Sequence, residues 1–313
     1  MSAAGPDPGG PGRGRGPRSA ALLLMAGLLA AGCGGEAGDE VDGYRLDRLF
    51  RVGSLEQPES VAWDGPRDRW LVAGGGTADG RGGGHVTAVG AGGDSVRRLW
   101  AGPASIRLGG ARGITAAGDT AWIAGGRELV AVDLAGDSVL FRSRVRNARR
   151  LHDVARGEDG SLFVSDAGAG IVWRIEPGGA SHARQPAVGS LRGPDGLLAE
   201  GFSGTRSGRL LVAGAEGAVL AVDPDSSVVL LAESPRFGRL DGLQRASDGG
   251  LVVGDRGTGR LHHLRRHSAR VWRTGRPWLT GLAAPADFVL RDTLLALPES
   301  DADRLTVYRV RAP

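Results

Sequence analysis

An alternating apolar and polar run, a charged turn and a second apolar run follow one another in LHDVARGEDGSLFVSD, residues 151 to 166. Two short runs of this kind joined by a turn that contains glycine are typical of a β-hairpin. The pattern returns in six stretches, which begin at residues 58, 111, 151, 194, 240 and 285. The chain is therefore predicted to consist of six copies of one β unit.

The spacing of the copies indicates how they are arranged. The steps between their second residues are 53, 40, 43, 46 and 45 residues. A period in the forties, made of short strands and Gly-rich turns, is typical of a β-propeller with one four-stranded antiparallel sheet, or blade, per copy. Runs such as ELVAVDLAGDSVLFRS at 128 to 143 supply the outer strands. We predict an all-β fold, a six-bladed β-propeller over residues 44–313.

The two ends of this region are predicted to meet. The sixth copy is one strand short, because the chain stops soon after RLTVYRV at 304 to 310. The segment YRLDRLFRV at 44 to 52 is a strand that precedes the first copy and has no hairpin partner. An unpaired sheet edge promotes aggregation, and pairing this segment with the last blade would cover one. The sequence thus predicts a propeller closed by its N-terminal strand.

The N-terminal segment has the pattern of a targeting signal. Arginines precede the apolar stretch ALLLMAGLLAAG at 21 to 32, which is too short to span a bilayer. LLAAGC resembles a bacterial lipoprotein signal, in which the cysteine, here Cys33, is lipidated. The alternative is an ordinary secretory signal with an incidental cysteine. We expect a lipoprotein signal peptide at 1–32, a flexible tether at 33–43, and anchoring in the bacterial cell envelope, on a periplasmic or outer-membrane face.

Composition and charge exclude several classes of function. The chain has 39 Lys+Arg against 35 Asp+Glu, a formal charge of +4, and it contains no lysine at all. A Walker-type phosphate loop, a Schiff base and a lysine general base are therefore excluded. No basic run is interleaved with aromatic residues, so we expect no nucleic-acid partner. We expect a monomer that contacts the membrane only through its lipid anchor.

The second residues of the six copies, here called the second-position ring, are Glu59, Arg112, His152, Asp195, Asp241 and Ala286. The first strand of a propeller blade is innermost, so these residues should surround one mouth of the central channel. Its three carboxylates would repel one another unless a cation neutralised them, and Ca²⁺, Mg²⁺, Mn²⁺ and Zn²⁺ all accept oxygen ligands. The alternative is that the Asp-Gly pairs at 195–196 and 241–242 merely begin turns.

These motifs together resemble the regucalcin and gluconolactonase family. The similar segments are ESVAW at 59, RLHD at 150, PDGL at 194 and LDGL at 240, and the resemblance covers nearly all of residues 44–313. It implies a six-bladed propeller, and the sugar lactonases of that family hydrolyse lactones with one divalent cation. The chain is most similar to the lipoprotein-type members of bacterial envelopes.

The resemblance also implies roles for individual residues. The family's metal ligands fall on Glu59, Asp195 and Asp241, with Asp195 in place of an asparagine. His152 replaces an asparagine that faces the substrate in lactonases, whereas Arg150 keeps the place of an arginine that contacts the substrate. Arg112 has no counterpart in the simplest lactonases, although the envelope members often carry a basic residue there.

Two functions are open on these grounds. The first is a metal-dependent hydrolase of a lactone or related small ester, with Asp241 as ligand and base and His152 as a further acid-base group. Arg150 and Arg112 would then orient an anionic or sugar-like substrate. The second is a non-catalytic propeller that uses the same ring to bind a small ligand or a protein. The fold alone does not decide between them.

Two other stretches have the composition of functional motifs. HHLRRH at 262 to 267 is predicted to be a surface strand, in which His262 and His263 point in opposite directions and cannot chelate one ion. GGGTADGRGGGH at 74 to 85 is predicted to be a loop beside the channel mouth rather than a phosphate cradle, because no lysine and no helical pattern follow it.

Overall fold

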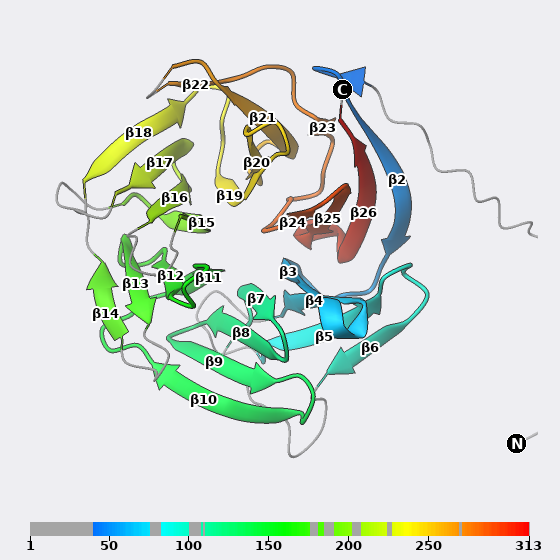
Figure 1. Ribbon diagram of the computed structural model, residues 1–313, viewed down its shortest axis with the longest axis vertical. Helices are drawn as coiled ribbons and strands as arrows, with labels where there is room; N and C mark the ends of the chain where they lie inside the picture. The colour runs from blue at the N-terminus through cyan, green and yellow to red at the C-terminus, as the bar shows by residue number, and fades with distance from the viewer. Residues whose placement is uncertain are drawn as a thin grey trace, which may run out of the picture. The chain divides into compact units, whose positions relative to one another are not determined.

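The computed structural model describes residues 40–75, 83–99, 108, 110–175, 181–184, 191–201, 208–223, 227–268 and 271–312. Their strands form six antiparallel sheets arranged in a circle, and the first strand of each copy lies nearest the centre (Figure 1). The predicted six-bladed propeller is thereby confirmed. No helix within the described ranges is long and apolar enough to cross a membrane. The predicted signal peptide, Cys33 and most of the Gly-rich loop at 74 to 85 lie outside the described residues.

The first five blades run outward in chain order. Blade 1 contains β3 (Pro58–Asp64), β4 (Arg69–Gly74), β5 (His85–Gly90) and β6 (Val96–Leu99). Blade 2 contains β7 (Gly113–Ala117), β8 (Thr120–Gly125), β9 (Glu128–Asp133) and β10 (Ser138–Arg144). Blade 3 contains β11 (Leu151–Arg156), β12 (Leu162–Asp166), β13 (Ile171–Ile175) and β14 (Ser181–Arg184). Blade 4 contains β15 (Pro194–Glu200), β16 (Arg209–Gly214), β17 (Ala218–Val222) and β18 (Val228–Glu233). Blade 5 contains β19 (Leu240–Arg245), β20 (Leu251–Asp255), β21 (Arg260–Arg266), β22 (Trp272–Thr274) and the short β23 (Leu279–Thr280).

The sixth blade is closed by the N-terminal strand, as predicted. Its own strands are β24 (Val289–Arg291), β25 (Leu294–Glu299) and β26 (Arg304–Arg311), and β2 (Tyr44–Val52) lies beside β26. The two strands pair antiparallel from Arg45 opposite Arg311 to Val52 opposite Leu305, and Figure 1 shows them in blue and red. β1 (Glu40–Val41) pairs with β2, so the sheet begins within the segment expected to be a tether. Two short 3₁₀ helices, η1 (Gly65–Arg67) and η2 (Ser300–Ala302), lie in hairpin turns.

The inner strands of four blades are irregular at the second position of the copy. Their register shifts between Pro58 and Ser60, Leu151 and Val154, Pro194 and Gly196, and Leu240 and Leu243. A β-bulge turns one side chain out of the regular ladder, and bulges are common next to functional sites. These bulges fall on Glu59, His152, Asp195 and Asp241. At these four positions of the second-position ring, the side chains therefore point in directions that a regular strand would not allow.

The Asp-Gly pairs have a structural role that differs from turn formation. Asp195 and Asp241 lie inside β15 and β19 and are completely buried, so the alternative that they merely begin turns is wrong. A Cβ atom on Gly196 would collide with the backbone carbonyl of Asp241, and one on Gly242 would lie 2.8 Å from the Cα of Asp287. Glycine therefore allows neighbouring inner strands to pack closely beside each aspartate.

Side chains at the third position link neighbouring blades. Ser60 Oγ donates a hydrogen bond to Asp287 Oδ2 over 2.7 Å and accepts one from the Ile114 backbone N–H over 3.2 Å. Asp153 Oδ2 accepts a hydrogen bond of 2.7 Å from the Leu197 N–H. Burial raises the pKa of Asp287 well above its usual range and the pKa of Asp153 to about 6. These two carboxyl groups therefore accept hydrogen bonds that link neighbouring blades.

The two adjacent histidines of β21 are buried, and the prediction of a surface strand is wrong. His262 Nε2 lies 3.4 Å from Asp255 Oδ2, whereas the His263 ring packs 5.2 Å from Tyr44 and 4.7 Å from Trp278. The two side chains do point to opposite faces, as expected. Both faces are covered because a propeller blade is packed between two neighbours, which the pattern of one strand does not reveal.

Candidate functional site

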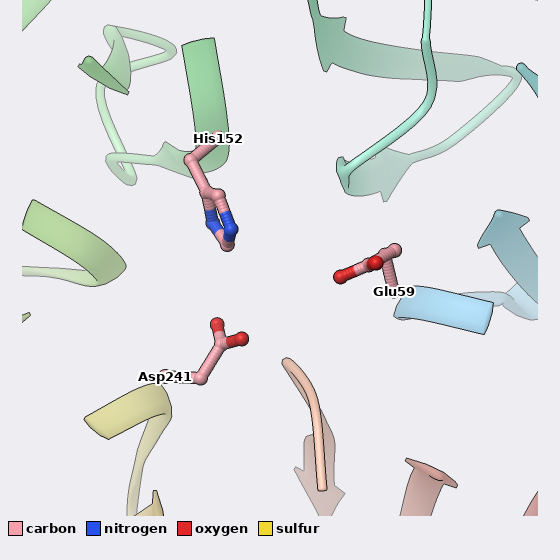
Figure 2. Close-up of side chains that lie close together, drawn as sticks. All are labelled: Glu59, His152 and Asp241. Atoms are coloured by element: carbon pink, nitrogen blue, oxygen red, sulfur yellow. The ribbon is translucent and has the colours of Figure 1, made fainter. Parts of the chain in front are cut away.

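Three members of the second-position ring converge on one point. Glu59 on β3, His152 on β11 and Asp241 on β19 each offer one ligand atom, and these atoms all lie within 4.8 Å of one another. Figure 2 shows the three side chains pointing toward a common centre. They come from blades 1, 3 and 5, so residues about 90 positions apart in the sequence are brought together by the circular arrangement of the blades. All three side chains are buried.

Several polar atoms in this cluster lack a hydrogen bond. Both carboxylate oxygens of Asp241 and both ring nitrogens of His152 are buried without a hydrogen-bond partner among the described residues. Leaving a buried polar atom without a hydrogen bond costs about 1–3 kcal/mol, so such atoms are nearly always paired. Converging atoms of this kind, one nitrogen and several oxygens, are the donor set that a divalent cation uses.

Asp195 lies beside this group rather than in it. Its Oδ2 accepts a hydrogen bond of 2.8 Å from Arg239 Nε. Its Oδ1 is 3.9 Å from His152 Nε2 and has no hydrogen bond within the part of the chain that the structure describes. The predicted metal set was Glu59, Asp195 and Asp241, whereas the group that lies closest together contains His152 in place of Asp195. The part of Asp195 in binding a metal stays a prediction.

The two arginines predicted to bind substrate occupy different surroundings. Arg112 Nη1 lies 3.7 Å from Glu59 Oε1 and therefore faces the cluster. The backbone N–H of Arg150 donates to Asp166 Oδ1 over 2.8 Å, and its side-chain Nε is buried without a hydrogen bond to any described residue. Asp166 thus fixes the backbone that carries Arg150, but the contact of Arg150 with a substrate stays a prediction.

Two further arginines complete the charge pattern, and neither was predicted from the sequence. Arg256 Nη1 lies 2.7 Å from Glu59 Oε2 and 3.6 Å from Asp241 Oδ2, and its Nη2 lies 3.4 Å from Glu59 Oε1. Arg239 holds Asp195. A sequence signal existed for Arg239, because it stands two residues before Asp241 as Arg150 stands two residues before His152. Arg256 follows the end of β20 and has no comparable signal.

The surroundings shift the pKa values of the three converging groups. Burial tends to raise the pKa of Glu59, but its hydrogen bonds to Arg256 and the charge of that residue outweigh burial and lower it. Burial, and then the nearby charge of Asp195, raises the pKa of Asp241 well above its usual range. Burial lowers the pKa of His152, which keeps the imidazole neutral with a lone pair available for a metal or a proton.

A cavity of about 370 Å³ lies farther along the same inner strands. Asp153 and Asp287 are the acidic residues in its lining, with Arg156, Arg291 and Gln244 among the other polar ones. Both carboxyl groups accept hydrogen bonds that join blades. Among the described residues, the buried atoms of His152, Asp195 and Asp241 that lack a hydrogen bond lie instead at the starts of the inner strands, and that is the candidate functional site.

The fold and the site define a class, namely six-bladed propellers with a polar cluster at the starts of their inner strands. No family model and no curated protein matches the sequence. Among solved structures, the chain is similar to a gluconolactonase from Xanthomonas campestris, with 17% identity, a TM-score of 0.62, and coverage of 86% of this chain and 90% of the other. It is also similar to a catalytically inactive histidine-to-alanine variant of virginiamycin B lyase from Staphylococcus aureus with quinupristin, with 12% identity, a TM-score of 0.58, and coverage of 85% and 99%. The likeness to gluconolactonase-type propellers is thereby confirmed for the fold.

Proposed function

We propose that the second-position ring binds one divalent cation and hydrolyses a lactone or a related small ester. The observation that supports this most is the set of buried atoms of Asp241 and His152 that converge with Glu59 and have no hydrogen bonds to the described residues. Of the cations considered, Mn²⁺ and Zn²⁺ suit a mixed nitrogen and oxygen set better than Ca²⁺ and Mg²⁺, which prefer oxygen alone. The likeness to a gluconolactonase is consistent with a lactone as substrate.

The residues of the cluster would divide the work of hydrolysis. A bound cation supplies a Lewis acid for the carbonyl oxygen and lowers the pKa of a water molecule. Neither carboxylate oxygen of Asp241 has a hydrogen bond among the described residues, so one would hold the cation while the other accepts a proton from the attacking water. Arg112, whose Nη1 lies 3.7 Å from Glu59 Oε1, would orient the substrate. His152 either holds the cation or transfers the proton, and both roles need its neutral form.

Elemental analysis and thermal unfolding of the purified mature protein test this proposal. We expect one bound cation per chain, and a rise in melting temperature of roughly 5 °C when Mn²⁺ or Zn²⁺ is present at about 100 times its Kd. Asp241→Asn and Glu59→Gln should lose this rise, whereas Asp119→Asn, which alters an exposed carboxylate that pairs with Arg67, should keep it. Absence of any metal effect in the unaltered protein would contradict the proposal.

Turnover separates the two open functions. A lactonase should cleave members of a lactone panel, and this activity should disappear with chelator and with Asp241→Asn. His152→Gln should lose the cation if His152 is a ligand, but keep the cation and lose turnover if His152 transfers the proton. Cation binding without turnover would favour the non-catalytic propeller. The ion pairs of Arg256 with Glu59 and Asp241 favour that second function, because they balance part of the negative charge without a cation.

The location of the protein is proposed from its N-terminus. LLAAGC places Cys33 where a lipid would be attached, and an acyl chain provides anchoring without a membrane-spanning segment. A lipid-anchored propeller would meet small ligands of the cell envelope, which agrees with a lactone or sugar-like substrate. Cell fractionation tests this location, as described in the Discussion.

A further inference from the structure

Arg256 occupies part of the space that a cation would use. Its guanidinium lies 2.7 Å from Glu59 and 3.6 Å from Asp241, so it sits between two of the three converging side chains. Its side chain is 18% exposed, and it is carried by the loop that follows β20 rather than by a strand. Arg256 is therefore partly exposed to solvent and lies outside the ladder of the sheet.

A cation and this arginine compete for the same oxygens. Glu59 Oε2 cannot coordinate a cation at full strength while it accepts the 2.7 Å hydrogen bond from Arg256 Nη1. A guanidinium and a divalent cation at neighbouring positions also repel each other, and most strongly where water is scarce. Binding of a cation would therefore release Arg256 from at least one of its two partners.

The charge balance shows what the released arginine would need. Three carboxylates of the ring, on Glu59, Asp195 and Asp241, lie beside three guanidiniums, on Arg112, Arg239 and Arg256. When all three carboxylates are ionised, these charges cancel. A divalent cation then leaves an excess of two positive charges at a largely buried site. An anionic group of a ligand is the natural compensation, and arginine binds carboxylates in a fork of two hydrogen bonds.

We propose that Arg256 is an exchangeable counterion: it holds Glu59 and Asp241 before the cation binds, and afterwards it binds a carboxylate of the ligand. This inference rests on the proposed cation site and deepens it, because it names the chemical group of the ligand that Arg256 would bind. The ligand carries a carboxylate, either as a substituent of the substrate or as the acid that hydrolysis releases. Cation and carboxylate should therefore bind cooperatively, each strengthening the other by the same factor.

Isothermal titration calorimetry with Mn²⁺ and D-gluconate tests the exchange. In Arg256→Gln we expect Mn²⁺ to bind about tenfold more tightly, because a competing charged hydrogen bond is gone, and gluconate to bind the Mn²⁺-loaded protein about tenfold more weakly. Arg209→Gln, which removes an exposed arginine paired with Asp223, should change neither affinity. D-sorbitol, which has the hydroxyls but no carboxylate, should not distinguish Arg256→Gln from the unaltered protein. Titrating gluconate into Mn²⁺ alone corrects for binding in solution.

The opposite signs of the two effects are the decisive result, because a purely structural role of Arg256 would weaken both ligands together. Mn²⁺ binding that is unchanged or weaker in Arg256→Gln overturns the exchange. If Mn²⁺ binds neither the unaltered protein nor this variant, the proposed cation site itself is wrong. Circular dichroism checks the fold of each variant. Should Arg256→Gln not fold, Arg256→Met decides, since it removes the charge and the fork but keeps an unbranched side chain, and it should still bind Mn²⁺ more tightly than the unaltered protein.

Discussion

Replacement of Leu46 by alanine tests the closure of the propeller in a quantitative way. Leu46 lies on β2 and is 3% exposed, and it belongs to a core cluster that includes Phe288, Leu297 and Val310. A buried Leu→Ala change costs about 2–5 kcal/mol, since it removes apolar contacts and leaves a cavity. At roughly 2 °C per kcal/mol for a domain of this size, we expect the melting temperature to fall by about 4–10 °C.

Leu49 provides the matched control for this measurement. It lies on the same strand, three residues later, but is 40% exposed. Leu49→Ala should therefore change stability by about 0.5 kcal/mol or less, which is about 1 °C. Differential scanning calorimetry of both variants gives the comparison. If both leucines had the same small effect, β2 would not be packed on blade 6 in solution, and the reasoning on closure would be refuted.

Three further predictions concern other parts of the chain. A chain that begins at Gln57 lacks β2, so it should expose the edge of β26 and aggregate or unfold at lower temperature. A melting temperature equal to that of the whole mature protein would contradict the closure. Cys33→Ser should move the protein from the membrane fraction to the soluble envelope fraction or leave it unprocessed, and equal fractionation of the two forms would exclude lipidation. The pKa of Asp153 rises from 3.8 to about 6 on folding, so the protonated carboxyl group stabilises the folded protein. This stabilisation is at most about 3 kcal/mol; it is complete below pH 4 and is lost as the pH rises through 6. Denaturant unfolding of Asp153→Asn should show a shallower loss of stability between pH 4 and 6, and an unchanged slope would show that another group is responsible.

The repeat in the sequence was sufficient to predict the architecture. Short strands and turns depend on local patterns of apolar residues and glycine, and six copies with a period in the forties have few ways to bury their faces other than a circle. The unpaired strand at 44 to 52 and the short sixth copy predicted the closure, because an exposed sheet edge is unfavourable. Equivalence between copies also predicted that Glu59, His152 and Asp241 would share a site, since identical positions in the blades lie at the same distance from the axis.

Only the tertiary structure decided which groups meet across the blades. His262 and His263 are buried because both faces of β21 are covered by other blades, and no local pattern contains that information. Asp195 and Asp241 lie on β-bulges rather than in turns, where the glycine that follows each of them packs closely against the neighbouring inner strand. Arg256 reaches Glu59 across 197 positions of the chain from a loop whose conformation the repeat does not specify. The periodicity of the sequence therefore determined the fold and the positions of the ring residues. The arginines that balance the carboxylates of the ring have long side chains, and their partners come close only when the six blades are assembled.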